Sequence, residues 1–98
     1  MPIIRKPYQL PPRCKELLES LVAELLSPTE TGPLVTEEED VNRRWCVQVI
    51  WSAWAGVDRY DRESVIREAY RETIHLGPIL VARGLTPEED QIMGPSPS

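Results

Sequence analysis

The sequence predicts an all-α protein, and three observations lead to this prediction. Two long segments repeat apolar residues at helical spacing, glycines and prolines follow the ends of these segments, and no proline occurs between residues 34 and 77. Proline disrupts the interior of a helix because it lacks a backbone donor and clashes with the preceding turn. We therefore expect a compact three-helix bundle with a short C-terminal fourth helix and an extended proline-rich N-terminal arm.

The length of 98 residues limits the chain to one domain. We expect an extended arm over 1–11, a single helical domain over 12–93 and a disordered tail over 94–98. The chain has no run of about 18 apolar residues that could span a membrane. Its first residues also lack the apolar core and cleavage site of a signal peptide. A cytoplasmic protein is therefore expected.

The first helix is predicted over 12–26. Apolar residues recur there at three-and-four spacing, which forms one stripe on a helix. This stripe consists of Cys14, Leu17, Leu18, Leu21, Val22, Leu25 and Leu26. The pair Ser27-Pro28 then ends the helix, and a linker rich in turn-forming residues follows.

The second helix is predicted to begin just after Thr36 and to continue to Ala55, with Thr36 as N-cap and Glu39 at the third helical position of a capping box. Only Gln48 and Ser52 interrupt the apolar stretch WCVQVIWSAWAG, and on a helix they fall on one narrow strip. A surface helix needs an apolar arc only somewhat wider than 100°. This helix should therefore be central, with part of its surface left uncovered by two neighbouring helices.

The third helix is predicted to begin at Asp58 or Asp61, both good N-caps, and to stop before Gly77-Pro78. Glu63–Arg67 and Glu68–Arg71 are favourable pairs on its surface. The following PILVARGL is too short to assign beyond one or two helical turns. Thr86, Pro87 and the acids after them then predict a short final helix.

The chemistry available to the chain is limited. Cys14 and Cys46 lie among apolar neighbours and are interpreted as reduced core thiols, although a disulfide stays possible. Glu72 and the single histidine, His75, form one half of a di-iron motif, so only a homodimer could complete such a site. The glycines are isolated and form no phosphate-binding loop. We therefore expect no catalytic, cofactor-binding or metal-binding residues, and no enzyme activity.

Nucleic-acid binding is an alternative because a short turn joins the second and third predicted helices, as in a helix-turn-helix. The third helix and its approach carry Arg59, Arg62, Arg67 and Arg71. The acids Asp58, Asp61, Glu63, Glu68 and Glu72 offset these charges, and the whole chain has a net charge of −5. Because phosphate repels acidic surfaces, nucleic acid is an unlikely partner.

The function expected from these observations is protein–protein binding by a small regulatory or assembly factor. Its interface would include Trp51, Trp54, Arg59 and Tyr60, on the surface shared by the second and third predicted helices. Tryptophan and tyrosine are enriched among residues that dominate binding energy. The partner is expected to be another protein or a second copy of the chain, not a membrane. The alternatives are a helix-turn-helix DNA-binding regulator and a small helical enzyme or enzyme subunit.

Overall fold

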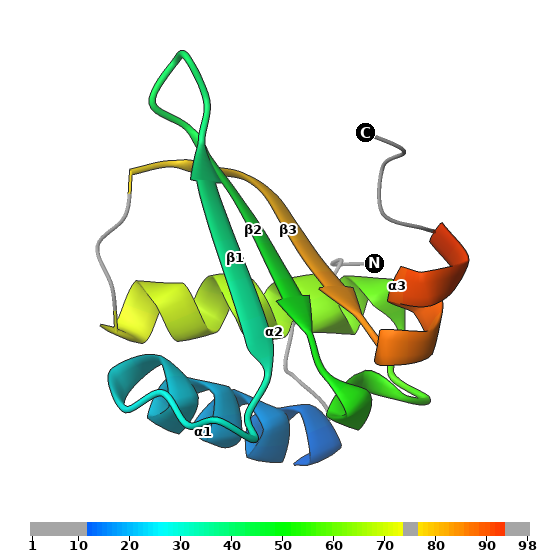
Figure 1. The fold of residues 1–98 in the computed structure, drawn as a ribbon. Helices are drawn as coiled ribbons and strands as arrows, with labels where there is room; N and C mark the ends of the chain where they lie inside the picture. The colour runs from blue at the N-terminus through cyan, green and yellow to red at the C-terminus, as the bar shows by residue number, and fades with distance from the viewer. Residues whose placement is uncertain (1–11, 74–76, 94–98) are drawn as a thin grey trace, which may run out of the picture.

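The computed structural model describes residues 12–73 and 77–93, and it contains a β-sheet as well as helices (Figure 1). In chain order the elements are α1 (Pro12–Leu26), β1 (Leu34–Glu39), β2 (Trp45–Ile50), the 3-10 helix η1 (Ser52–Trp54), α2 (Arg59–Thr73), β3 (Ile79–Leu85) and α3 (Pro87–Met93). The prediction of an all-α three-helix bundle is therefore wrong. The predicted arm over 1–11 and tail over 94–98 lie outside the described residues.

The main correction concerns 36–55, which forms two strands and a 3-10 turn instead of one helix. In β2 the buried residues Val47 and Val49 alternate with partly exposed ones, which is the two-residue period of a strand. Valine, isoleucine and tryptophan also favour strands. A short apolar run is compatible with the period of a strand and with that of a buried helix, so the sequence alone did not distinguish them. The expected capping box is absent because Thr36 is an exposed residue of β1.

The hairpin between β1 and β2 contains a turn signal that a helix could not accommodate. The Asp40 carboxylate accepts hydrogen bonds from the backbone N–H of Asn42 at 2.8 Å and of Arg44 at 2.9 Å. Arg43 adopts a φ of 59°, outside the helical region. Aspartate and asparagine stabilise such turns through their own side chains. The four residues after Asp40 therefore reverse the chain and place β2 beside β1.

The sheet has the strand order β1-β2-β3, with β1 antiparallel to β2 and β2 parallel to β3. Parallel neighbours require a long crossover connection, and α2 provides it. Residues 79–85, which we expected to form at most two helical turns, are the third strand of this sheet.

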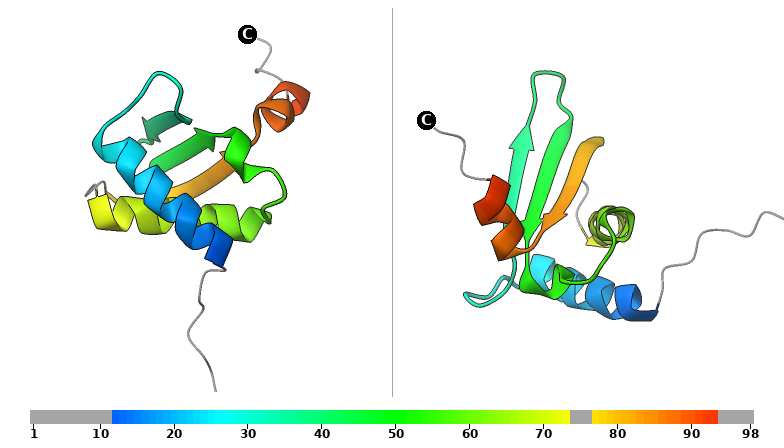
Figure 2. Two further views of the ribbon diagram at one scale, coloured as in Figure 1. Left: turned by 90° about the horizontal axis from the view of Figure 1, so that it is seen from below. Right: turned by 90° about the vertical axis from the view of Figure 1, so that its right-hand side faces the viewer.

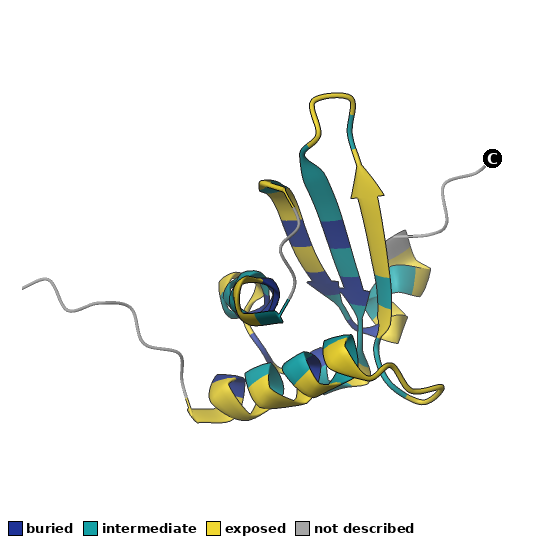
Figure 3. Ribbon diagram, turned by 90° about the vertical axis from the view of Figure 1, so that its left-hand side faces the viewer, coloured by how far each residue is buried: buried dark blue, intermediate teal, exposed yellow. Residues whose placement is uncertain are grey.

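Helix α2 packs on one face of the sheet, against β3, while α1 packs against α2 and runs across the end of the sheet where β1 begins and β2 ends (Figures 1 and 3). The core between them is formed by Cys14, Leu21, Val47, Val49, Trp54, Val57, Val65, Ile66, Ala69, Tyr70 and Ala82. Among the described residues, the short helix α3 alone lies near the opposite face, at one end of the sheet (Figure 2). Within 12–73 and 77–93, no helix is long and apolar enough to cross a membrane.

Several local predictions are confirmed. Helix α1 has the predicted bounds, Pro12–Leu26. Helix α2 begins one residue after Asp58, whose carboxylate accepts a hydrogen bond from the backbone N–H of Tyr60 at 2.8 Å. The predicted surface pairs of α2 form, with Arg67–Glu63 at 2.9 Å and Arg71–Glu68 at 3.6 Å. Local capping and helical spacing thus identify these helices correctly.

Candidate partner-binding site

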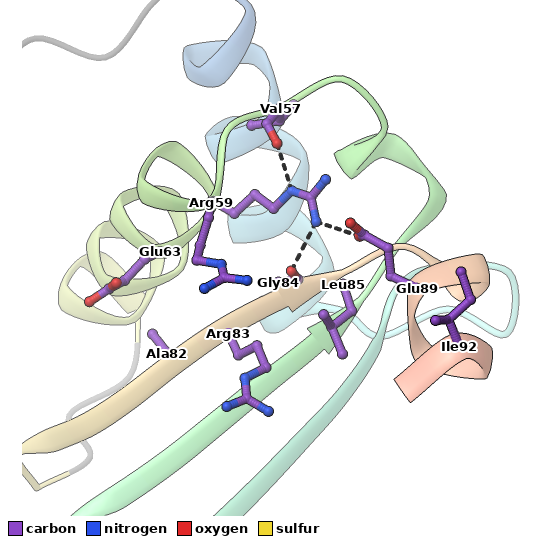
Figure 4. Close-up of a pocket in the computed structure, with 10 residues that line it drawn as sticks. Val57, Arg59, Glu63, Ala82, Arg83, Gly84, Leu85, Glu89 and Ile92 are labelled. Carbon is purple, nitrogen blue, oxygen red and sulfur yellow. Dashed lines mark hydrogen bonds and ion pairs between the residues drawn. The ribbon is translucent and has the colours of Figure 1, made fainter. Parts of the chain in front are cut away.

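A pocket of about 670 Å³ opens between the start of α2, the end of β3 and α3 (Figure 4). Apolar and charged side chains line it together. These residues are Val57, Arg59, Arg62, Glu63, Ala82, Arg83, Gly84, Leu85, Glu89 and Ile92. The set contains no serine, cysteine, histidine or lysine, so the pocket lacks the usual nucleophiles and the histidine most often used in proton transfer. Its composition favours binding over catalysis.

Arg62 connects the elements around this pocket. Its side chain is buried, and its guanidinium donates hydrogen bonds to the backbone carbonyls of Val57 at 2.8 Å, Trp54 at 3.0 Å and Gly84 at 3.1 Å. A fourth bond, of 2.6 Å, reaches the Glu89 carboxylate on α3. Arg62 therefore joins α2 to η1, β3 and α3, and its role within the domain is structural.

Glu89 holds α3, which forms one wall of the pocket, in position. Its carboxylate accepts a hydrogen bond from the Thr86 backbone N–H at 2.8 Å, while its own N–H donates to the Thr86 hydroxyl at 3.2 Å. These two bonds form a capping box. The bond from the Thr86 backbone, together with the nearby Arg62 guanidinium, lowers the pKa of Glu89. The carboxylate is therefore ionised at neutral pH and holds α3 in place.

Gly84 is required where β3 borders the pocket, because another element approaches its backbone closely. A Cβ atom at this position would lie 2.9 Å from the indole ring of Trp54 and 3.0 Å from Cβ of Arg62. Glycine within a strand often marks such a close approach. The absent side chain leaves room for Trp54 to seal the core behind the pocket.

Arg59 and Arg83 are the two pocket arginines that have no hydrogen bond or ion pair in the described part of the chain. Both are exposed, Arg59 at the start of α2 and Arg83 on β3 (Figure 4). The two pocket acids are already engaged, Glu63 with Arg67 and Glu89 with Arg62. The unpaired charge at the pocket is therefore positive.

Apolar surface accompanies these arginines. Ile92 is 84% exposed on α3, and Leu85 is half-buried at the end of β3. Tyr60, next to Arg59 in sequence, is 77% exposed. A partner that covered this end of the molecule would bury an aromatic and a large aliphatic side chain along with the two cations.

The four residues predicted to bind a partner lie in two different environments. Trp54 is fully buried and donates its indole N–H to the Val49 carbonyl at 3.1 Å. Trp51 is partly buried and packs edge-to-face against Trp54, with ring centroids 5.1 Å apart. Arg59 lines the pocket, and Tyr60, the next residue of α2, is exposed. Only Arg59 and Tyr60 are therefore fully accessible to a partner in this structure.

Sequence reasoning did not assign Arg62, Arg83, Glu89 and Ile92 to a binding site. The position of Arg62 could have been found, because it lies three residues before Val65 and four before Ile66, on the same face of α2. An arginine at that spacing indicates a buried charge with partners. Arg83 and Ile92 carried no such signal: Arg83 lies on β3, which was not predicted, and the place of Ile92 on α3 beside the pocket depends on that strand.

The other candidate chemistries gain no support from the structure. In the part of the chain that it describes, no three His, Cys, Asp or Glu residues are placed to hold a metal ion. His75, the basis of the di-iron alternative, lies outside that part. Cys14 and Cys46 are both free, and burial raises the pKa of the Cys14 thiol, which keeps it protonated.

Comparisons with known proteins indicate no family for this chain. No protein-family model matches the sequence, and neither the curated proteins nor the solved structures contain a match to it. The pocket beside β3, with its two unpaired arginines, is the structural feature that bears most directly on function.

Proposed function

We propose that this chain is a small cytoplasmic interaction module that binds a partner protein at the pocket beside β3. The observation that carries the proposal is the pair of exposed, unpaired arginines, Arg59 and Arg83, on a rigid frame. Ile92 in the pocket lining and Tyr60, the residue after Arg59, are also exposed. Interfaces are enriched in arginine and aromatic residues, and a few such residues dominate the binding energy.

The rigid frame supports a binding role because it reduces the cost of association. Arg62 and Glu89 hold α2, β3 and α3 together through buried or partly buried hydrogen bonds. Interactions that fix a site before a partner arrives limit the conformational entropy lost on binding. The exposed side chains then extend from secondary structure elements and not from a loop.

The two alternative functions have less support. A helix-turn-helix regulator needs a helix before α2, but that segment consists of β2 and η1. A small enzyme needs reactive groups in a pocket, and the lining residues provide only arginine and glutamate among the ionisable types. Protein binding therefore remains the function that the geometry favours.

Site-specific cross-linking in native lysate tests the proposal. A photoreactive amino acid would replace Ile92, which lines the pocket, and in a second protein Val41, which is 98% exposed at the hairpin tip. We expect one set of proteins to be cross-linked from position 92 and not from position 41. Adding Arg59→Glu and Arg83→Glu should abolish this cross-linking. Identical cross-links from both positions, or cross-links insensitive to the arginines, would overturn the proposal.

A further inference from the structure

We propose that the pocket beside β3 recognises a short acidic peptide segment of its partner, with carboxylates paired to Arg59 and Arg83 and an apolar side chain against Leu85 and Ile92. This inference rests on the proposed function and adds the chemistry of the partner to it. It follows from charge, from exposed apolar surface and from the hydrogen bonds that β3 already makes.

Charge complementarity indicates the sign of the partner. Arg62 is bound to three carbonyls and to Glu89, so it is not free for a ligand. Arg59 and Arg83 have no such partners in the described ranges. Each guanidinium presents a planar set of donors that matches both oxygens of a carboxylate. Two carboxylates in one flexible segment, spaced to reach α2 and β3, would satisfy both arginines.

Apolar contact next to these charges indicates that the segment is not purely acidic. Ile92 is 84% exposed and Leu85 is half-buried on the same pocket. Placing one aliphatic side chain between them would remove apolar surface from water, which favours association in proportion to the area buried. An acidic segment with a single leucine or isoleucine combines both requirements.

The hydrogen bonds of β3 determine how such a segment is held. The Gly84 carbonyl accepts from Arg62 at 3.1 Å, and the Ile79 carbonyl accepts from Arg67 at 2.9 Å. Arginine side chains of α2 thus occupy carbonyls near both ends of this edge strand. Strand addition depends on free backbone groups along an edge, so recognition here should depend on side chains, and above all on charge.

Nucleic acid is a poorer match for the same two arginines. Its backbone carries a phosphate about every 3.4 Å along each strand and is bound by extended tracts of positive charge. Here acids flank the pocket, with Asp58 before α2 and Glu88 and Asp90 on α3. A long polyanion would meet these carboxylates, whereas a short acidic segment could contact the arginines and end before reaching them.

Peptide titration followed by NMR tests this inference on the full chain. The probe is acetyl-Glu-Glu-Leu-Glu-Glu-amide, and its control is the same peptide with every glutamate replaced by glutamine. We expect the acidic peptide to shift the amide signals of the pocket residues, with weaker binding at higher salt, and the neutral peptide to cause no comparable shift. Arg59→Gln and Arg83→Gln should each weaken binding by about fivefold, between the values typical of exposed and of well-formed charged pairs.

Arg43→Gln is the matched control for these variants. Arg43 is exposed in the β1–β2 hairpin, at the opposite end of the sheet from the pocket, so its replacement should leave peptide affinity unchanged. Circular dichroism checks that all three variants remain folded. The inference is overturned if the neutral peptide binds equally well, if neither pocket variant weakens binding, or if an oligonucleotide binds at these residues more tightly than the peptide.

Competition in the lysate experiment separates this inference from the proposed function. If the acidic peptide prevents cross-linking from position 92, both stand. If cross-linking from position 92 persists in the presence of saturating acidic peptide, the partner is not recognised through this chemistry, although protein binding stands. If no cross-link depends on the pocket, the proposed function itself has failed.

Discussion

Arg62 places a charge on the face of α2 that otherwise contains Val65, Ile66, Ala69 and Tyr70. Burying a charge is costly unless it is paired and hydrogen-bonded. Here three carbonyls and one carboxylate surround the guanidinium. The same side chain therefore fills a core position and determines how the elements around the pocket meet.

We predict that Arg62→Ala lowers the free energy of unfolding by about 3 kcal/mol, because breaking a buried charge network usually costs about 3–5 kcal/mol. The carbonyls of Trp54, Val57 and Gly84 would lose their donor, and α3 would lose its main link to α2. Urea denaturation measures the change. Arg59→Ala is the control, with an expected change within about 0.5 kcal/mol because this side chain is exposed and unpaired. Equal effects of the two variants would show that Arg62 is not structural.

Trp54 fills the space between the sheet and α2, and it is fully buried with its indole N–H bonded to Val49. We predict that Trp54→Ala costs about 3–5 kcal/mol, the usual range for removing a large buried aromatic side chain. Trp51→Ala should cost less, since Trp51 is only partly buried. Urea denaturation followed by circular dichroism provides both values. A Trp54→Ala protein that stayed as stable as the wild type would contradict the core role.

At the scale of elements, local sequence signals were sufficient to predict the helices but not the sheet. The bounds of α1 and the cap at Asp58 follow from residues close in sequence. Strands depend on partners far along the chain: β2 pairs with β3 through residues such as Val49 and Gly84. No local pattern indicates that pairing, and Thr36 with Glu39 imitates a helix cap inside a strand. Because β3 was not foreseen, neither was the pocket beside it.

The capping box of α3 is an element-scale feature that the sequence did indicate. We predict that Thr86→Ala destabilises the protein by about 1 kcal/mol, the typical loss when a threonine N-cap is removed. The Glu89 N–H would lose its acceptor, so the first turn of α3 should exchange its amide protons faster. Hydrogen exchange and urea denaturation measure the two effects. Thr86→Ser should behave like the wild type because serine caps equally well, and its failure to do so would point to lost packing instead.

The lowered pKa of Glu89 also predicts a pH dependence. An unfolded glutamate has a pKa of about 4.3, so the stabilisation from ionised Glu89 is fully present above this pH. It is lost as the pH falls through the lower pKa of the folded state. We expect the stability difference between wild type and Glu89→Gln to be largest near pH 7 and to shrink in acid. Asp40, whose pKa is also lowered, is present in both proteins, so its contribution to the pH dependence of stability cancels in this comparison. A difference that is constant with pH would contradict the assignment.

At the scale of the whole molecule, the charges are unevenly distributed over the two edges of the sheet. The edge strand β1 exposes Glu37, Glu38 and Glu39, while the edge strand β3 lies beside the two unpaired arginines. The net charge of −5 should slow the approach of polyanions generally. The pocket is therefore a local positive site on an acidic protein, which favours a partner with a short acidic segment over one with an extended negative surface.

The outer face of the sheet decides whether the chain should associate with itself. Self-association was expected because a helix over 36–55 would have left apolar surface uncovered, and that helix does not exist. By alternation along the strands, the residues on the face away from α1 and α2 form three cross-strand rows. They are Leu34, Ile50 and Leu85; then Thr36, Gln48 and Arg83; then Glu38, Cys46 and Val81. The first row is wholly apolar, the second is polar, and the third combines Cys46 and Val81 with a glutamate.

We therefore predict that the protein is a monomer at micromolar concentration. Contiguous apolar patches beyond about 300–600 Å² mark interaction surfaces. The polar row of Thr36, Gln48 and Arg83 interrupts the outer face, so we expect no contiguous apolar patch of that area there. Light scattering should give a mass near 11.2 kDa that does not change on dilution. Leu34→Glu, at an exposed position in the apolar row, should leave this mass unaltered. A dimer in the wild type that Leu34→Glu converts to a monomer would contradict the prediction and identify the apolar row of the sheet, which ends at the pocket residue Leu85, as a self-association surface.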